Sequence, residues 1–273
     1  MHRGGSKILT YILLTLGAMV AAAPIAGVLL IALDRPGAAV SGIALPNHIG
    51  LADIEQVWSQ GGFASSLGWS AMITVTTVVI AAVVAVPAGF AFATIRFPGR
   101  SPLFYLFLFG LLLPYAAVLI PAYYEMRTLS LAGTPWAVIL PSAALSVAFG
   151  VFWMRAVFLG VPRELLEAAR VDGATNPLIM LRIALPLVRS AVLVLVLLTF
   201  LWTWNSFMVP LVMLAGSSIQ TATLSMASFQ GGHVDDIPGL AAAALFVSIP
   251  VIVLYVVTQR HFIRGMTEGG LKM

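Results

Sequence analysis

The segment Leu67–Ile95 reads LGWSAMITVTTVVIAAVVAVPAGFAFATI and contains no charged side chain. About 20 apolar residues in a helix are enough to cross the hydrocarbon layer of a membrane, and this segment is longer than that. Lipid offers no hydrogen-bond partner to an unpaired backbone group, so an open chain can stand there only as a helix. The segment therefore predicts a transmembrane helix, and the rest of the chain repeats its pattern.

The whole chain has the composition of a protein that crosses the membrane several times. Of its 273 residues, 60% are hydrophobic and only 9% are charged, and the mean hydropathy is +1.03, well outside the range of soluble domains. The first apolar run is too long for the apolar region of a signal peptide, which favours an uncleaved span. We predict an all-α membrane protein with six transmembrane helices, at about 8–33, 67–95, 101–124, 128–154, 190–214 and 237–259.

Lysine and arginine are distributed unevenly between the two sides that six spans define. With the N-terminus inside, twelve of them fall on the inner side and only Arg35 and Arg127 on the outer side. Basic residues gather on the cytoplasmic side of membrane proteins, and the opposite topology would invert this excess. Both termini are therefore predicted to be cytoplasmic. The same asymmetry accounts for the net charge of +4 without a nucleic-acid partner.

Several classes of site are disfavoured by the residues present. The chain has no cysteine, which excludes disulfides and thiolate metal sites. His2, His48, His233 and His261 are scattered without the spacing of metal ligands, so we expect no metal site. Neither lysine belongs to a G-x-x-x-x-G-K-[ST] loop that could cradle nucleotide phosphates. With no catalytic triad or carboxylate pair in the spans, we expect no enzymatic activity and no cofactor bound by this chain.

The polar stretch VPRELLEAARVDGATNP, residues 161–177, lies between the fourth and fifth predicted spans and predicts a helix, a break and a second helix. Pro162 suits the first helical position, where its missing N–H costs nothing. Gly173 can take the left-handed conformation that ends a helix. Asn176 and Pro177 indicate the cap and first residue of the second helix.

The first of these helices carries small and apolar side chains on one face, at Leu165, Ala168 and Ala169. A face of this kind permits close approach of a partner surface. A solvated loop with a chance amphipathic turn is the alternative interpretation.

The stretch resembles the EAA loop of ABC importer permeases. Glu167-Ala168-Ala169 is followed after two residues by Asp172-Gly173-Ala174, and then by Ile183, Leu185 and Pro186. In that family the loop, here residues 161–186, forms the coupling helix that docks into a groove on a cytoplasmic ATPase. The resemblance implies a single permease domain, 1–273, of the type I fold. It also implies that the ATPase contact is carried by Glu167, Ala168, Ala169, Asp172 and Gly173. Met180 stands where many relatives have an aromatic residue, which should alter the packing under the loop.

Other segments extend the resemblance over most of the chain. FPGR at 97–100 and TWNSF at 203–207 are similar to family motifs, and QRHFIRGMTEGGLKM at 259–273 is similar to the closing segment of maltose-type second permeases. These motifs favour the carbohydrate branch. Two features depart from the pattern: the loop after the first span lacks the usual S-[LF]-[KR] segment, and Trp69-Ser70 replaces the common Asn-Ser. Both lie near the predicted outer side, where cargo and binding-protein contacts are expected.

The predicted spans contain no Asp, Glu, Lys, Arg or His, whereas an ion-coupled transporter usually keeps an acid or base of this kind for its relay. This favours a neutral, polyhydroxy solute driven by an external motor. Aromatic faces can stack on sugar rings and amide or hydroxyl groups can bond sugar hydroxyls. The candidate path residues are therefore Asn205, Trp204, Trp202, Tyr115 and Ser142. Each tryptophan could instead lie in an interfacial belt.

Every predicted span contains a proline, which can kink a helix and open a cavity or can simply be tolerated, as it often is in membrane helices. The six are Pro24, Pro87, Pro114, Pro141, Pro210 and Pro250.

The resemblance implies a bacterial plasma-membrane location and a defined set of partners. These are a second homologous permease, two ATPase subunits that bind ATP and Mg²⁺, an extracytoplasmic solute-binding protein, and membrane lipid. The same mechanism with a glycerophosphodiester or polyol phosphate as cargo remains an alternative. A non-transporting membrane scaffold and a channel or uniporter are alternatives of other classes, although a scaffold leaves the EAA spacing unexplained.

Overall fold

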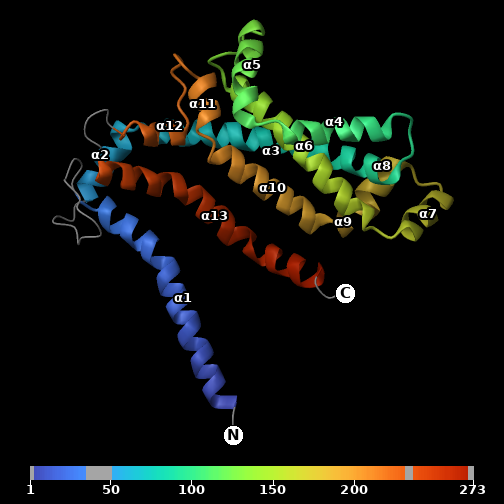
Figure 1. The fold of residues 1–273 in the computed structure, drawn as a ribbon, viewed down its shortest axis with the longest axis horizontal. Coiled ribbons are helices and arrows are strands. Elements are labelled where there is room, and N and C mark those ends of the chain that lie inside the picture. The colour runs from blue at the N-terminus through green and yellow to red at the C-terminus, as the bar shows by residue number, and fades with distance from the viewer. Residues whose placement is uncertain (1–2, 35–50, 231–235, 270–273) are drawn as a thin grey trace. The chain divides into compact units, whose positions relative to one another are not determined.

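The structure, a computed structural model, describes residues 3–34, 51–230 and 236–269, and these residues form helices and connecting turns with no strand (Figure 1). The predicted all-α class is therefore confirmed. In chain order the elements are α1 (Arg3–Ala32), α2 (Leu51–Gln60), α3 (Phe63–Thr94), α4 (Arg100–Leu112), α5 (Tyr115–Thr128), α6 (Pro135–Leu159), α7 (Arg163–Val171), α8 (Asn176–Ile179), the π-helix η1 (Met180–Ala184), α9 (Leu185–Leu187), α10 (Arg189–Trp204), α11 (Met208–Met213), α12 (Ala222–Ala227) and α13 (Ile237–Gly269).

Four of the described helices contain a single segment long and apolar enough to cross a membrane: Thr10–Ala32, Phe63–Thr94, Pro135–Leu159 and Ile237–Gln259. Two further pairs of helices meet the same criterion together but are sharply bent. The α4–α5 pair bends by 103°, and the pair formed by Asn176–Leu187 and Arg189–Trp204 bends by 83°. The number of spans reaches six when each bent pair crosses once.

The third predicted span, 101–124, is thus two helices rather than one. Leu113 and Pro114 between them have extended backbone, with ψ of 128° and 122°. By contrast, Pro24, Pro87 and Pro141 lie inside continuous helices. Proline lacks the N–H that a helix interior uses and can therefore interrupt a helix. Among these four prolines, only Pro114 lies at a break between helices.

The chain divides into two compact units, each with its own core. The first consists of Met1–Leu67 and Ala222–Val251. Its core includes an aromatic cluster in which the ring of Phe63 lies 5.1 Å from Phe246 and 6.4 Å from Phe229. Such offset and tilted ring pairs add to the stability gained from burial.

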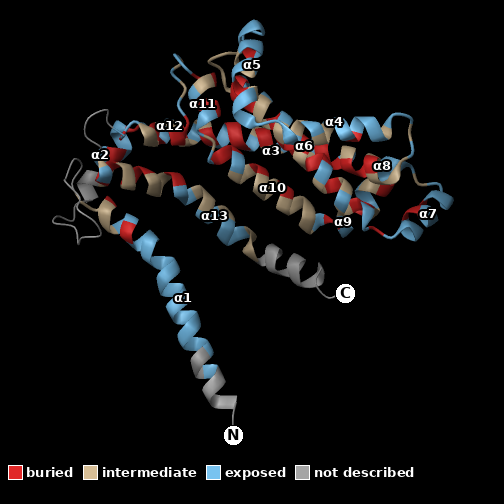
Figure 2. Ribbon diagram, in the orientation of Figure 1, coloured by how far each residue is buried: buried red, intermediate tan, exposed pale blue. Residues whose placement is uncertain are grey.

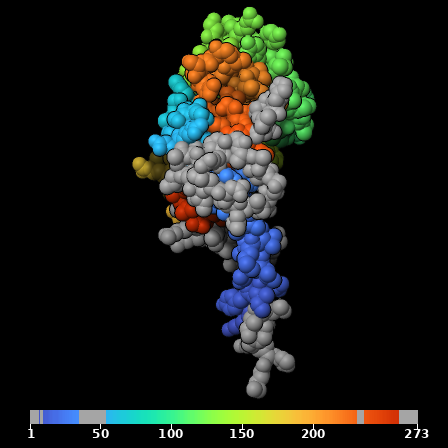
Figure 3. Space-filling view, turned by 90° about the vertical axis from the view of Figure 1, so that its left-hand side faces the viewer, coloured from blue at the N-terminus to red at the C-terminus, as the bar shows by residue number. Residues whose placement is uncertain are grey.

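The described side chains of α1 are mostly exposed although most are apolar, as the pale-blue ribbon in Figure 2 and the blue surface in Figure 3 show. Tyr11, Leu14 and Val20 are examples. An apolar surface of this kind is suited to contact with lipid, because acyl chains are as apolar as leucine side chains.

The second unit consists of Gly68–Thr221 and Ile252–Met273. Its core is the meeting point of α3, α6 and α10. A Cβ added to Gly150 of α6 would lie 2.6 Å from the Cβ of Ala85 on α3 and 3.2 Å from Leu195 on α10. Small residues at such crossings let membrane helices approach closely. The indole N–H of Trp153 donates to the carbonyl of Ala191 at 3.1 Å and further ties α6 to α10.

Candidate functional site

The predicted helix–break–helix of the loop 161–186, hereafter the coupling loop, is present as α7, a turn and α8. Gly173 has φ of +81°, and the N–H of Ala174 donates to the carbonyl of Ala169 at 2.9 Å. This is the geometry of a glycine-terminated helix, because the glycine accepts a backbone that a Cβ would strain. The starts differ by one residue from the prediction: Pro162 precedes α7, and Thr175 rather than Asn176 precedes the first residue of α8.

The faces of α7 differ in what they contact. Leu166 and Ala169 are buried against the core of the second unit, which also includes Ile179 and Ala184. Leu165 and Ala168, which share the predicted small-residue face with Ala169, are exposed. Burial of every third or fourth residue holds the helix on the protein and leaves the opposite face free.

The five predicted coupling residues therefore divide into two groups. Ala169 packs inward and is 8% exposed. The other four are exposed: Glu167, Ala168, Asp172 and Gly173. Beneath them α7 packs against η1, where Met180 is half-buried against the same core. A π-helix is rare and is often found at functional positions.

A cavity of about 350 Å³ opens where α4 and α5 meet, between these helices, α6 and α10. It brings together three of the five predicted path residues, Tyr115, Ser142 and Trp202. Trp202 is 51% exposed, and its ring meets Phe149 edge-on with centroids 4.8 Å apart. Tyr115 and Ser206 are joined by a side-chain hydrogen bond. Irregular backbone at membrane depth is tolerated where it lines such a cavity, which accounts for the break at Leu113.

The lining of this cavity is uncharged. Its hydroxyl groups belong to Tyr115, Ser142, Ser146, Thr203 and Ser206, and the remaining side chains are leucine, phenylalanine and tryptophan. Hydroxyls both donate and accept hydrogen bonds, and aromatic faces offer apolar contact area. The arrangement suits a neutral molecule that carries many hydroxyl groups and has an apolar face.

The other two predicted path residues do not line the cavity. Asn205 is exposed and its side-chain amide donates to the carbonyl of Leu201 at 2.8 Å, where it satisfies the end of α10. Trp204 is buried at 3% exposure and stacks on Phe200 with centroids 5.5 Å apart.

Sequence reasoning missed several lining residues, notably Ser146, Phe149 and Ser206. Ser142, Ser146 and Phe149 follow at four- and three-residue intervals and share one face of α6, a signal that the sequence contained. Among the described residues, no group of three or more His, Cys, Asp or Glu side chains lies together as metal ligands would.

Known proteins that are similar to this chain belong to transport systems. The family described as "Binding-protein-dependent transport system inner membrane component" matches residues 85–268. The arabinooligosaccharides transport system permease protein AraQ of Halalkalibacterium halodurans is 33% identical, with 100% of both chains covered. The trehalose transport system permease protein SugB of Mycobacterium tuberculosis is 27% identical over 98% of this chain and 99% of its own.

Solved structures show a similar fold. A crystal structure titled as a bacterial ABC transporter involved in the import of the acidic polysaccharide alginate contains a chain with a TM-score of 0.78. The match covers 94% of this chain and 96% of that one at 23% identity, so the likeness is one of fold.

Proposed function

This chain belongs to the inner membrane components of binding-protein-dependent transport systems, and we propose that it moves a neutral oligosaccharide or related polyol as a permease subunit of an ATP-driven importer. Family membership makes it a multi-pass protein of the bacterial plasma membrane and confirms the resemblance drawn from the EAA loop. Its named relatives are transport permeases rather than enzymes.

The uncharged cavity with its five hydroxyls and the half-exposed Trp202 is the observation that carries the cargo class. A sugar presents hydroxyls at its rim and C–H groups on its ring face, which match the two kinds of lining. The names of AraQ and SugB point to oligosaccharide cargo for those relatives. This chain would take cargo of the same chemical class.

The exposed face of α7 would dock on an ATPase subunit. Glu167, Ala168 and Asp172 are available for that contact, while Leu166 and Ala169 fix α7 to the core. Burial on one face and exposure on the other is what a helix needs in order to transmit a displacement between two proteins. Closure of the ATPase pair would then switch the path between inward- and outward-facing states.

The assembly would contain this permease, a second homologous permease, two ATPases with bound ATP and Mg²⁺, and a solute-binding protein on the outer side. The basic residues would place both termini and the coupling loop in the cytoplasm. The tail at 259–273 would add a second ATPase contact, but its side chains lie outside those described, apart from Gln259.

Cargo with a phosphate group is the second candidate within the same mechanism. A phosphate is bound best by arginine or lysine, and no charged side chain lines the cavity. The neutral cargo is therefore the better match, and a scaffold without transport would leave the cavity without a role.

The test uses the complex of this chain with its partner permease, ATPases and binding protein in proteoliposomes. Ala168→Gln and Asp172→Asn alter the exposed face of α7, and Glu164→Gln is the matched control, because Glu164 is exposed on the same helix but outside the motif. We expect the first two variants to lose ATPase retention or solute-stimulated ATP hydrolysis and the control to keep both. If no ATPase co-purifies with the wild type, or if all three variants behave as wild type, the proposal is wrong.

A further inference from the structure

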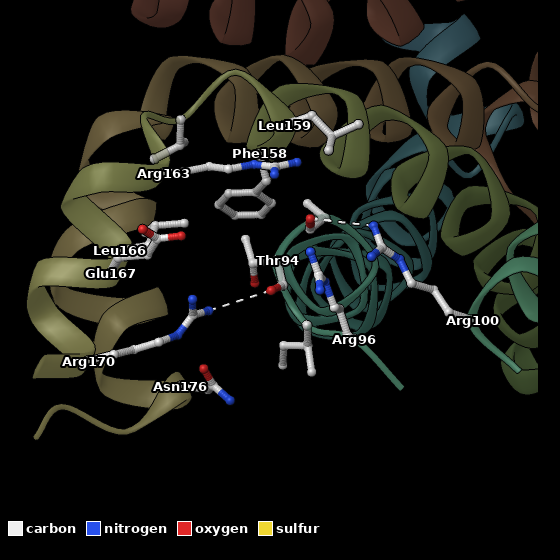
Figure 4. Close-up of a pocket in the computed structure, with 13 residues that line it drawn as sticks. Thr94, Arg96, Arg100, Phe158, Leu159, Arg163, Leu166, Glu167, Arg170 and Asn176 are labelled. Carbon is white, nitrogen blue, oxygen red and sulfur yellow. Dashed lines mark hydrogen bonds between the residues drawn. The ribbon is translucent and has the colours of Figure 1, made fainter. Parts of the chain in front are cut away.

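A second cavity, of about 620 Å³, lies beside α7 and is lined by four arginines and one glutamate. Arg163 and Arg170 enter it from α7, Arg96 enters it from the segment between α3 and α4, and Arg100 from the start of α4 (Figure 4). Its formal charge is three positive. This arginine pocket is distinct from the uncharged cavity, which is lined by other residues.

Two of the four arginines have structural partners. The guanidinium of Arg100 donates to the carbonyl of Ala93 at 3.4 Å, and that of Arg170 donates to the carbonyl of Thr94 at 3.5 Å. These carbonyls end α3, where the helix dipole is negative and favours a cation.

The other two arginines are available to a ligand. In the described part of the chain, the side chains of Arg96 and Arg163 have no hydrogen bond or ion pair to another residue. Glu167 also lines the pocket without an ion pair to them. Four guanidinium groups gathered around one hollow repel one another, and a bound anion removes that repulsion.

The pocket lies at the ends of predicted spans. It adjoins the last residues of α3 and α6 and the first residue of α4, and its apolar wall includes Ile95, Phe158 and Leu159. A hollow that combines an apolar wall with a ring of arginines at the membrane surface matches a phospholipid, whose phosphate adjoins its glycerol and acyl chains. Basic pockets between helices on the cytoplasmic side are known binding places for anionic headgroups.

We infer that the arginine pocket binds the phosphate of an anionic phospholipid from the cytoplasmic leaflet and so places a lipid headgroup against the coupling loop. The inference rests on the proposed function for the side of the membrane and for the role of α7. Arginine binds a phosphate through two parallel N–H groups, and Arg163 brings these groups to the pocket from α7 and Arg96 from the segment after α3.

An acidic surface of the ATPase is the competing ligand, and the faces of α7 argue against it. Pocket-lining residues of α7 follow helical spacing, at Arg163, Leu166, Glu167 and Arg170. Ala168 and Asp172 are exposed and do not line the pocket. One side of α7, at whose edge Glu167 lies, thus faces the pocket, while Ala168 and Asp172 on the rest of its exposed surface stay free for a protein.

The experiment titrates short-chain phosphatidylglycerol onto the full detergent-solubilised complex and counts bound lipid by native mass spectrometry. The test variant is Arg96→Gln with Arg163→Gln, which removes two charges without breaking the contacts to α3. The matched control is Arg182→Gln with Arg189→Gln, which removes two exposed arginines of the same predicted side outside the pocket. Short-chain phosphatidylcholine and inorganic phosphate are the comparison probes.

We expect the wild type and the control to bind phosphatidylglycerol with equal affinity and the test variant to bind about 30-fold more weakly. Each arginine near an anionic lipid contributes about a fivefold factor. Three results would overturn the inference. The first is equal lipid binding by the test and control variants, and the second is displacement of the lipid by inorganic phosphate at one tenth of the lipid's concentration. The third is that the test variant loses ATPase subunits while its lipid binding is unchanged. Lipid binding is measured without transport, so a complex that transports but lacks this lipid site refutes only the inference. A complex that binds the lipid but never transports refutes only the proposed function.

Discussion

Trp202 offers the most direct test of the proposed cargo, through the substitution Trp202→Ala. A tryptophan side chain has about 150–250 Å² of surface to bury, and 51% of Trp202 is exposed, which leaves about 100 Å² for a sugar ring to cover. At about 25 cal/mol per Å², full coverage stabilises the bound solute by about 2.5 kcal/mol. A ring covers part of that surface, so we expect the dissociation constant to rise by about 5- to 70-fold.

The assay is equilibrium binding of a radiolabelled oligosaccharide to the purified complex without the binding protein, which would otherwise dominate the measured affinity. Trp202→Phe keeps an aromatic face and should restore much of the binding. Trp136→Ala is the matched control, because Trp136 is 48% exposed and lies outside the cavity lining. Thermal unfolding checks that loss of the edge contact with Phe149, about 1 kcal/mol, has not unfolded the protein. Unchanged binding by Trp202→Ala, or equal weakening by both alanine variants, would refute the reasoning.

Three further predictions concern stability and coupling. Gly150→Ala places a Cβ 2.6 Å from a neighbouring Cβ and should destabilise the protein by about 1–3 kcal/mol in thermal unfolding, whereas Gly68→Ala, which meets nothing within 4 Å, should be neutral or better. Gly173→Ala places a Cβ on a backbone with φ of +81°, which costs about 1–2 kcal/mol, and should weaken ATPase retention. Gly173→Asn, which tolerates this conformation better, should retain more of the ATPase than Gly173→Ala. Identical behaviour of the two variants would contradict this account. Trp153→Phe removes the indole donor from the carbonyl of Ala191, which stays bonded within α10, and should lower stability by about 0.5–1.5 kcal/mol.

The controls separate local from global effects. Each variant is compared by size-exclusion profile and by amount of complex recovered. If Gly68→Ala destabilises as much as Gly150→Ala, the helix crossing is not the cause of the loss.

The shape of the coupling loop could be predicted because its determinants are local. Gly173 ends α7 because glycine accepts the left-handed backbone that a helix end requires. The neighbouring prolines fix their own φ angle and lack an N–H in any surroundings. The one-residue differences at Pro162 and Thr175 are of the size expected at helix ends.

The bend between α4 and α5 could not be predicted in the same way. Several spans contain a proline, and whether a helix continues through it depends on what its neighbours offer to the freed carbonyls. Pro87 and Pro141 stay inside helices while Pro114 marks a break, and sequence alone does not distinguish them.

Asn205 is a predicted path residue because its amide can bond sugar hydroxyls. An unpaired amide in hydrocarbon would also be costly. The structure satisfies the amide within its own helix through the carbonyl of Leu201, so that cost never arises. Trp202 and Ser142 do line the cavity. Their polar groups favour protein or water over lipid, and this preference does not depend on which neighbouring helix forms the other wall.

The link between Arg170 and the last carbonyl of α3 has a mechanical consequence. Arg170 is near the end of α7, and its guanidinium reaches Thr94, 76 residues earlier in the chain. Leu166 and Ala169 hold the same helix by burial. A force applied to α7 would therefore reach the end of α3 through this contact as well as α6 through the chain connection. A displacement at the surface would then pull on two long helices rather than on one.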